Sequence, residues 1–238
     1  MSDKRKLKFS FGQGKQHSRN NRNNRSLFYL ISTCLALSVA SLALFISLSG
    51  FAVSQLFLES FITSYSTIVF SIFFSLLAFF YILYKTNSIE FAVKNLGLNR
   101  KMITPKNILI GLSLFVIMLI VEFGISAFSQ VTHIALPTNV QQVLSGLPIY
   151  FFVFTFLIAP INEEIFFRGF LVNRIGIIPS ALLFALLHFG YASISEFVAA
   201  LIFGFVAGYV FKKTGSLYTT IIAHILLNML TIVALFLI

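Results

Sequence analysis

The residues best suited to chemistry lie between Asn162 and Arg168, where two adjacent glutamates and an arginine interrupt a strongly apolar stretch. Ionisable side chains inside a membrane segment are costly, so they generally mark a functional site and need partners. Glu164 and Arg168 are four residues apart, which places them on one face of a helix and predicts an ion pair. Glu163 points about 100° away from that pair. It is therefore the candidate general base.

Further polar groups at helical spacing follow later in the chain. His188 comes four residues after Phe184, and His224 comes four residues before Asn228. At 1.5 Å per residue, Glu163, His188 and His224 each lie about 16 Å from the expected cytoplasmic ends of three different helices. This common depth predicts a polar site near the middle of the membrane. There Glu163 and His188 would activate water, and His224 and Asn228 would stabilise the oxyanion that forms.

Zinc is the main chemical alternative, because two histidines and one carboxylate are a common catalytic ligand set. In that case Glu163, His188 and His224 would bind the metal. The sequence lacks the His-Glu-x-x-His arrangement of helical zinc proteases, so a metal-free site without a cofactor is favoured. The one aspartate, Asp3, lies in the N-terminal tail, which excludes an aspartyl dyad. Glu122 has no partner that the sequence can identify.

The composition indicates which elements must position these groups. Of the 238 residues, 58% are hydrophobic and 10% are charged, whereas a soluble domain carries about 25% charged residues. The sequence therefore predicts an all-α integral membrane protein, a bundle of about seven transmembrane helices, with six to eight possible. The fifth and sixth apolar stretches are short for full spans. The seven stretches are 27–49, 61–84, 107–131, 147–167, 177–192, 196–211 and 217–237.

The distribution of basic residues predicts the orientation. Residues 1–25 contain eight Lys and Arg and one acidic residue. Such a tail is typical of a disordered cytoplasmic N-terminus that sets topology, and nucleic-acid binding is not expected. With the N-terminus inside and seven spans, every other Lys and Arg falls in or beside a cytoplasmic segment. The expected outer connections, near 50–60, 132–146 and 193–195, contain none.

Three regions follow along the chain. Residues 1–26 are the tail, residues 27–144 hold the N-terminal transmembrane helices with a basic cytoplasmic loop at 85–106, and residues 145–238 form the catalytic region. Within the loop, Ile89 to Leu98 are expected to form a short amphipathic helix on the inner leaflet. Pro160 and Gly169 flank the glutamates and are expected to kink or loosen their helix.

Three motifs together resemble one known family. Glu163-Glu164-x-x-x-Arg168, Phe184-x-x-x-His188 and His224-x-x-x-Asn228 occur in this order on separate predicted spans. Over residues 145–232 they resemble the CPBP intramembrane proteases, also called the Abi family, which include CAAX prenyl endopeptidases and bacteriocin-processing enzymes. The resemblance implies that the first Glu and the middle His activate water. It also implies that the last His and the Asn stabilise the tetrahedral intermediate, while Glu164 and Arg168 support the site.

The favoured interpretation is a multi-pass endopeptidase of a cell membrane, with a bacterial plasma membrane as the expected location. Its site is expected to open to the cytoplasmic leaflet. The expected partners are membrane lipid and a hydrophobic peptide or membrane-protein substrate, with a bacteriocin system or a sensor kinase as further candidates. Three alternatives stay open: a non-proteolytic bacteriocin-immunity or sensor-kinase regulatory protein, a zinc-dependent form of the protease, and a proton-coupled transporter.

Overall fold

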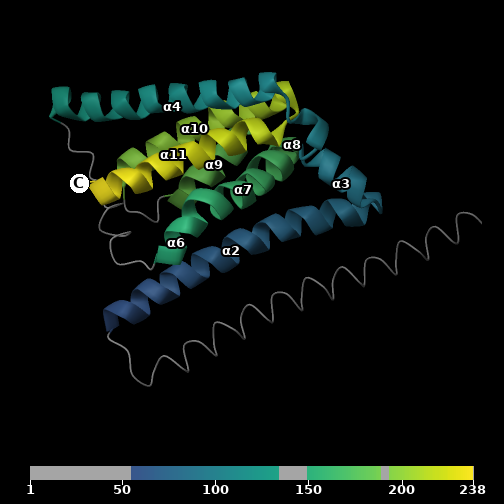
Figure 1. Cartoon of the computed structure of the whole chain (residues 1–238), viewed down its shortest axis with the longest axis horizontal. Helices are drawn as coiled ribbons and strands as arrows, with labels where there is room; N and C mark the ends of the chain where they lie inside the picture. The colour runs from purple at the N-terminus through teal and green to yellow at the C-terminus, as the bar shows by residue number, and fades with distance from the viewer. Residues whose placement is uncertain (1–54, 134–148, 189–192, 238) are drawn as a thin grey trace, which may run out of the picture.

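The computed structural model describes residues 55–133, 149–188 and 193–237, and these residues form helices with short connections and no strand. The expected all-α class is therefore confirmed (Figure 1). The predicted tail at 1–26 and the first span at 27–49 lie outside the described residues. The helices before the predicted catalytic region are α2 (Gln55–Thr86), α3 (Ile89–Asn95), the 3₁₀ helix η1 (Arg100–Met102) and α4 (Pro105–Thr132). Those that follow are α6 (Ile149–Val153), η2 (Phe154–Ile158), α7 (Ala159–Glu164), η3 (Ile165–Leu171), α8 (Val172–Ile175), α9 (Ile177–His188), α10 (Ile194–Thr214) and α11 (Leu217–Leu237).

Five helices of the described chain are long and apolar enough to cross a membrane. For the expected short fifth stretch, the described part is α9, which has 12 residues and spans about 18 Å, and residues 189–192 of that stretch lie outside the described residues. The expectation of a short sixth stretch is wrong, since α10 has 21 residues. Its start is extended by the Ser193 hydroxyl, which accepts a hydrogen bond from the Glu196 amide. The helix then continues through Lys213 and ends at Gly215, whose φ is 65°.

The helix that carries the two glutamates runs from Ile149 to Ile175 and includes two π-helical turns, η2 and η3. Pro160 follows η2 directly in the first turn of α7. Proline lacks the backbone N–H that an α-helix needs at this position, so a local widening of the helix is the expected response. The helix continues past Gly169 to Ile175, as the depth estimate for Glu163 required. Irregular turns therefore flank the glutamates on both sides.

Small residues set the packing of α9 against α10. A Cβ added at Gly204 would lie 3.0 Å from the Cα of Ala181, and one added at Gly208 would lie 3.0 Å from the Ile177 side chain. This close approach of two backbones is the usual role of the Gly-x-x-x-Gly pattern in membrane helices. The other large helix contact is between α4 and α11. Together these two pairs enclose the core cluster that surrounds the candidate site.

The loop between α2 and α4 lies at one end of the bundle, beside α8 (Figure 1). The expected short helix is confirmed as α3, with Ala92 buried and Phe91 exposed. The Leu217 amide donates to the Gly97 carbonyl at 3.0 Å, and the Tyr218 hydroxyl donates to the Leu98 carbonyl at 3.0 Å. The loop is therefore fastened to the start of α11 and closes this end of the bundle.

Two glycines of α4 give a matched test of this packing. A Cβ at Gly111 would lie 2.8 Å from the Thr219 carbonyl oxygen of α11, whereas a Cβ at Gly124 meets nothing within 4 Å. Gly111→Ala is expected to destabilise the protein by about 1–3 kcal/mol, because α4 and α11 must separate. Gly124→Ala should be neutral or stabilising by up to about 1 kcal/mol. Thermal unfolding of the purified protein in detergent measures both, and equal effects would contradict the packing.

Candidate active site

Glu164 and Arg168 form a fully buried ion pair. Arg168 Nη1 lies 2.9 Å from Glu164 Oε1, and both side chains are at most 1% exposed. The pair has the i, i+4 spacing that the sequence predicted, although Arg168 lies within the π-helical segment η3. A buried charge without its partner would be strongly unfavourable. These two residues therefore stabilise each other's charge inside the bundle.

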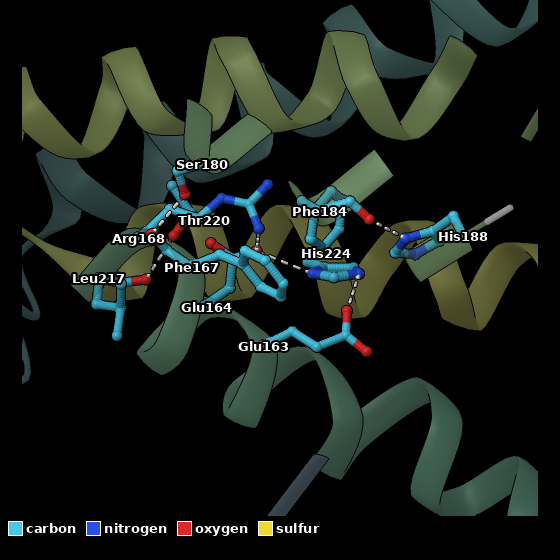
Figure 2. A network of polar contacts seen from close by, with 10 residues as sticks. All are labelled: Glu163, Glu164, Phe167, Arg168, Ser180, Phe184, His188, Leu217, Thr220 and His224. Carbon is cyan, nitrogen blue, oxygen red and sulfur yellow. Dashed lines mark hydrogen bonds and ion pairs between the residues drawn. The ribbon is translucent and has the colours of Figure 1, made fainter. Parts of the chain in front are cut away.

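His224 of α11 lies between the two glutamates (Figure 2). Its Nδ1 is 3.0 Å from Glu164 Oε1, and its Nε2 is 3.8 Å from Glu163 Oε2. Because a carboxylate only accepts, Nδ1–H donates to Glu164, which fixes the orientation of the ring. The sequence placed His224 at the right depth but did not predict that it contacts both carboxylates.

Aromatic rings enclose this charged group. The Arg168 guanidinium lies 4.2 Å from the ring centroid of Phe184 and 4.9 Å from that of Phe203. The same Phe203 ring makes an edge contact with His224 at a centroid distance of 4.9 Å. Cation–π contacts stabilise a guanidinium that is removed from water. Phe203, on α10, lies outside the three motifs, so sequence reasoning did not identify it.

His188 lies near His224 at the end of α9 (Figure 2). Its Nδ1 donates to the Phe184 carbonyl at 2.9 Å, so in the neutral ring Nε2 is an acceptor. Asn228 is one turn beyond His224 on α11, and its side-chain amide donates to the Thr155 carbonyl of η2 at 3.0 Å. An Asn side chain has a second N–H for another acceptor. The four predicted catalytic residues thus come from three helices, with Glu163 on α7, His188 on α9, and His224 and Asn228 on α11.

Two adjoining cavities reach these residues. The larger, of about 440 Å³, is lined by His188, His224 and Asn228 among others. The smaller, of about 80 Å³, is lined by Glu163, His188 and Asn228. Glu163 is 26% exposed, unlike Glu164, which is fully buried. Of the two glutamates, Glu163 is the one that water can approach.

Two acidic residues contribute to the cavity walls in ways that the sequence did not suggest. Glu122 of α4 lines the larger cavity, and Glu196 of α10 lines both. The sequence indicates Glu122 without a partner and does not indicate Glu196. The sequence nevertheless contains a spacing pattern that could have placed Glu122 on a polar helix face. Glu122, Ser126 and Ser129 are spaced by four and three residues, which forms a polar stripe along one face of an apolar helix.

Comparison with known proteins gives matches to the C-terminal region of the chain, which contains this candidate site. Residues 145–230 match the family model described as type II CAAX prenyl endopeptidase Rce1-like. The C-terminal region is Rce1-like. The resemblance predicted from the three motifs is therefore confirmed for this region. At the level of the family, the match supports an intramembrane protease of the CAAX type.

The Rce1-like region also resembles a bacterial protein. The protein described as uncharacterized protein YpbD of Bacillus subtilis (strain 168) is 32% identical over 89 residues. This alignment covers 37% of the present chain and 47% of the relative, so the chain matches about half the length of that protein. No solved structure matches the chain. With five helices able to span a membrane among the described residues, the Rce1-like region belongs to a multi-pass membrane protein.

Proposed function

We propose that this chain is a membrane endopeptidase of the glutamic type, which hydrolyses a peptide bond of a membrane-associated peptide or protein with Glu163 as the general base. The observation that carries the proposal is the position of His224 between a buried and an accessible carboxylate. Its Nδ1 lies 3.0 Å from Glu164 and its Nε2 lies 3.8 Å from Glu163. One carboxylate orients the imidazole, and the other has access to a cavity.

The division between the two glutamates follows from their surroundings. Glu164 is fully buried and paired with Arg168 at 2.9 Å, so it has no access to water and serves to hold Arg168 and His224. Glu163 lines a cavity together with His188 and Asn228. A general base must come within hydrogen-bonding reach of the water that it deprotonates. Of the two glutamates, only Glu163 meets this requirement.

The proposed reaction follows from these positions. A water molecule loses a proton to Glu163 while its oxygen attacks the carbonyl carbon, and His188 Nε2 orients that water as an acceptor. The oxyanion accepts hydrogen bonds from the side-chain N–H of Asn228 and from the Nε2–H of His224. The C–N bond then breaks, and the proton held by Glu163 moves to the leaving nitrogen. The scheme consumes one water molecule and needs no cofactor.

A zinc-dependent mechanism remains the alternative to this scheme. Whether the peptidase activity depends on zinc can be measured directly. Among the described residues, no three His, Cys, Asp or Glu side chains converge as a metal-binding set. We therefore expect purified protein to keep its activity after thorough treatment with a chelator and dialysis. Loss of activity on chelation, with recovery on adding stoichiometric Zn²⁺, would replace the metal-free scheme with the metal-dependent one.

Comparative peptidomics tests the function even though the substrate is unidentified. Cells that carry the wild-type protein are compared with cells that carry Glu163→Gln or His188→Ala at equal protein levels. A precursor peptide is expected to accumulate in both variants and to be cleaved in the wild type. If no precursor accumulates and the cellular phenotype is retained in both variants, the protein acts without proteolysis, as a bacteriocin-immunity or regulatory protein would.

A further inference from the structure

The helix of the two glutamates changes its hydrogen-bond register just before Pro160. In an α-helical register the Ala159 amide would donate to the Thr155 carbonyl, but in the π-helical turn η2 it donates to the Phe154 carbonyl instead. In the π-helical register the Thr155 carbonyl would accept from the amide of residue 160. That residue is Pro160, which has no backbone N–H. Neither register of its own helix therefore supplies a donor to the Thr155 carbonyl.

Asn228 of α11 supplies this donor from another helix. Its side-chain amide donates to the Thr155 carbonyl at 3.0 Å, and the contact is partly buried. Inside a membrane bundle a backbone carbonyl without a partner is costly, because no lipid group can replace the missing hydrogen bond. The π-helical turn and the proline together create a free acceptor, and Asn228 occupies it.

This contact decides which end of the Asn228 amide faces which way. An asparagine amide has a donor end and an acceptor end of similar size, and its partners determine the orientation. Because the Thr155 carbonyl can only accept, it holds Nδ2 on its side rather than Oδ1. Nδ2 carries two N–H groups, so a second donor remains for the cavities that Asn228 lines. A reversed amide would turn its oxygen toward a forming oxyanion and repel it.

Pro160 acts at a distance from the reacting groups. Its side chain is fully buried, and among the described residues that line the two cavities Pro160 does not occur. Its connection to the site is the backbone carbonyl of Thr155, five residues earlier. A role for Pro160 in the reaction would therefore be one of positioning.

We infer that Pro160 is a positioning residue of the candidate active site. By withholding a backbone N–H it reserves the Thr155 carbonyl for Asn228, and that carbonyl fixes the Asn228 amide with an N–H available to the substrate. The inference rests on the proposed function for the role of Asn228 in stabilising the oxyanion. It gives the proline a second effect besides the irregular helix that the sequence predicted around it.

A double-mutant cycle of Pro160→Ala and Asn228→Ala tests this link through cleavage of a synthetic form of the precursor found by peptidomics. Alanine restores an N–H at position 160, so the helix can satisfy Thr155 and the Asn228 amide loses its orientation. Pro160→Ala is expected to lower kcat by about 10-fold to 100-fold, with KM nearly unchanged. Asn228→Ala should lower kcat by about 100-fold to 1,000-fold. Adding Pro160→Ala to Asn228→Ala should cause no further loss.

The control for the proline substitution is Pro105→Ala. Pro105 is exposed and lies in the first turn of α4, where an α-helix needs no backbone N–H. This variant exchanges the same two residue types without freeing or occupying a carbonyl near the site. Its kcat should equal that of the wild type.

Thermal unfolding in detergent tests the same link without any need for activity. With Pro160 present, Asn228→Ala leaves the Thr155 carbonyl without a donor and should lower Tm. In the Pro160→Ala protein the same substitution should lower Tm by less, because position 160 then supplies the N–H. A proline that serves only to pack its ring would give equal Tm losses in both backgrounds.

Equal Tm losses in both backgrounds, or a Pro160→Ala protein that cleaves as fast as Pro105→Ala, would overturn the inference. Pro160→Ser restores the same N–H with a different side chain, so it should reproduce the results of Pro160→Ala. Failure of both variants to fold would assign Pro160 to the fold alone and would also overturn the inference. Unequal Tm losses in a protein that cleaves no precursor would support the link from Pro160 to Asn228 and contradict the proposed function.

Discussion

Replacing Glu163 by Gln is expected to slow cleavage of the precursor by about 100-fold to 10,000-fold, which is the usual contribution of general acid–base catalysis. The amide keeps the size of the side chain but cannot accept the proton from water. Because Glu163 is 26% exposed and its contact with His224 is 3.8 Å long, the fold should not depend on its charge. The measurement is the cleavage rate of the precursor by purified protein, together with its thermal unfolding.

The matched control for this substitution is Glu90→Gln. Glu90 is an exposed residue of α3 that pairs with Lys94 at 2.7 Å on the surface of the basic loop. This substitution removes the same charge far from the cavities, so the cleavage rate should stay close to that of the wild type. A Glu163→Gln protein that cleaves as fast as Glu90→Gln would remove Glu163 from the mechanism.

Replacing Arg168 by Met is expected to destabilise the protein by about 3–5 kcal/mol, because the fully buried Glu164 carboxylate loses its charged partner. Arg174→Met is the control from the same membrane segment. Arg174 stacks on Phe170 at 3.8 Å near the end of the bundle and is exposed, so its loss should cost about 0.5–1 kcal/mol. Thermal or denaturant unfolding in detergent gives both values.

A second substitution shows whether charge is the cause. In the Arg168→Met protein, Glu164→Gln removes the unpaired carboxylate, so the double variant should be more stable than Arg168→Met alone. Equal instability of the single and double variants would mean that Arg168 acts through its packing against Phe184 and Phe203. Activity of the double variant should stay low, because Glu164 no longer orients His224.

The sequence predicted the parts of this architecture that depend on distance along a helix. The rise per residue placed Glu163, His188 and His224 at one depth, and a spacing of four residues predicted the pair of Glu164 with Arg168. Long apolar runs predicted the helices because a single segment in a membrane satisfies its own backbone groups by forming an α-helix. These inferences do not depend on which helices are neighbours.

The remaining features depend on how the helices are rotated and packed. His224 contacts both glutamates because α11 turns its ring toward α7, which the linear sequence does not specify. Phe203 encloses Arg168 because Gly204 and Gly208 bring α10 close to α9. The basic loop lies against η3 at Gly169, where a Cβ would lie 2.8 Å from the Leu96 carbonyl oxygen, and neither residue carries a chemical signature. Spacing along one helix was therefore predictable, whereas contacts between helices were not.

The packing of the basic loop against one end of the bundle has an electrical consequence. A site that exchanges water with one side only takes its water from that compartment and returns its protons to the same compartment. The buried apolar cluster near the basic loop opposes the passage of ions, because an unpaired charge is strongly unfavourable in such surroundings. Under the proposed function, hydrolysis inside the bundle therefore needs no path for ions across the membrane.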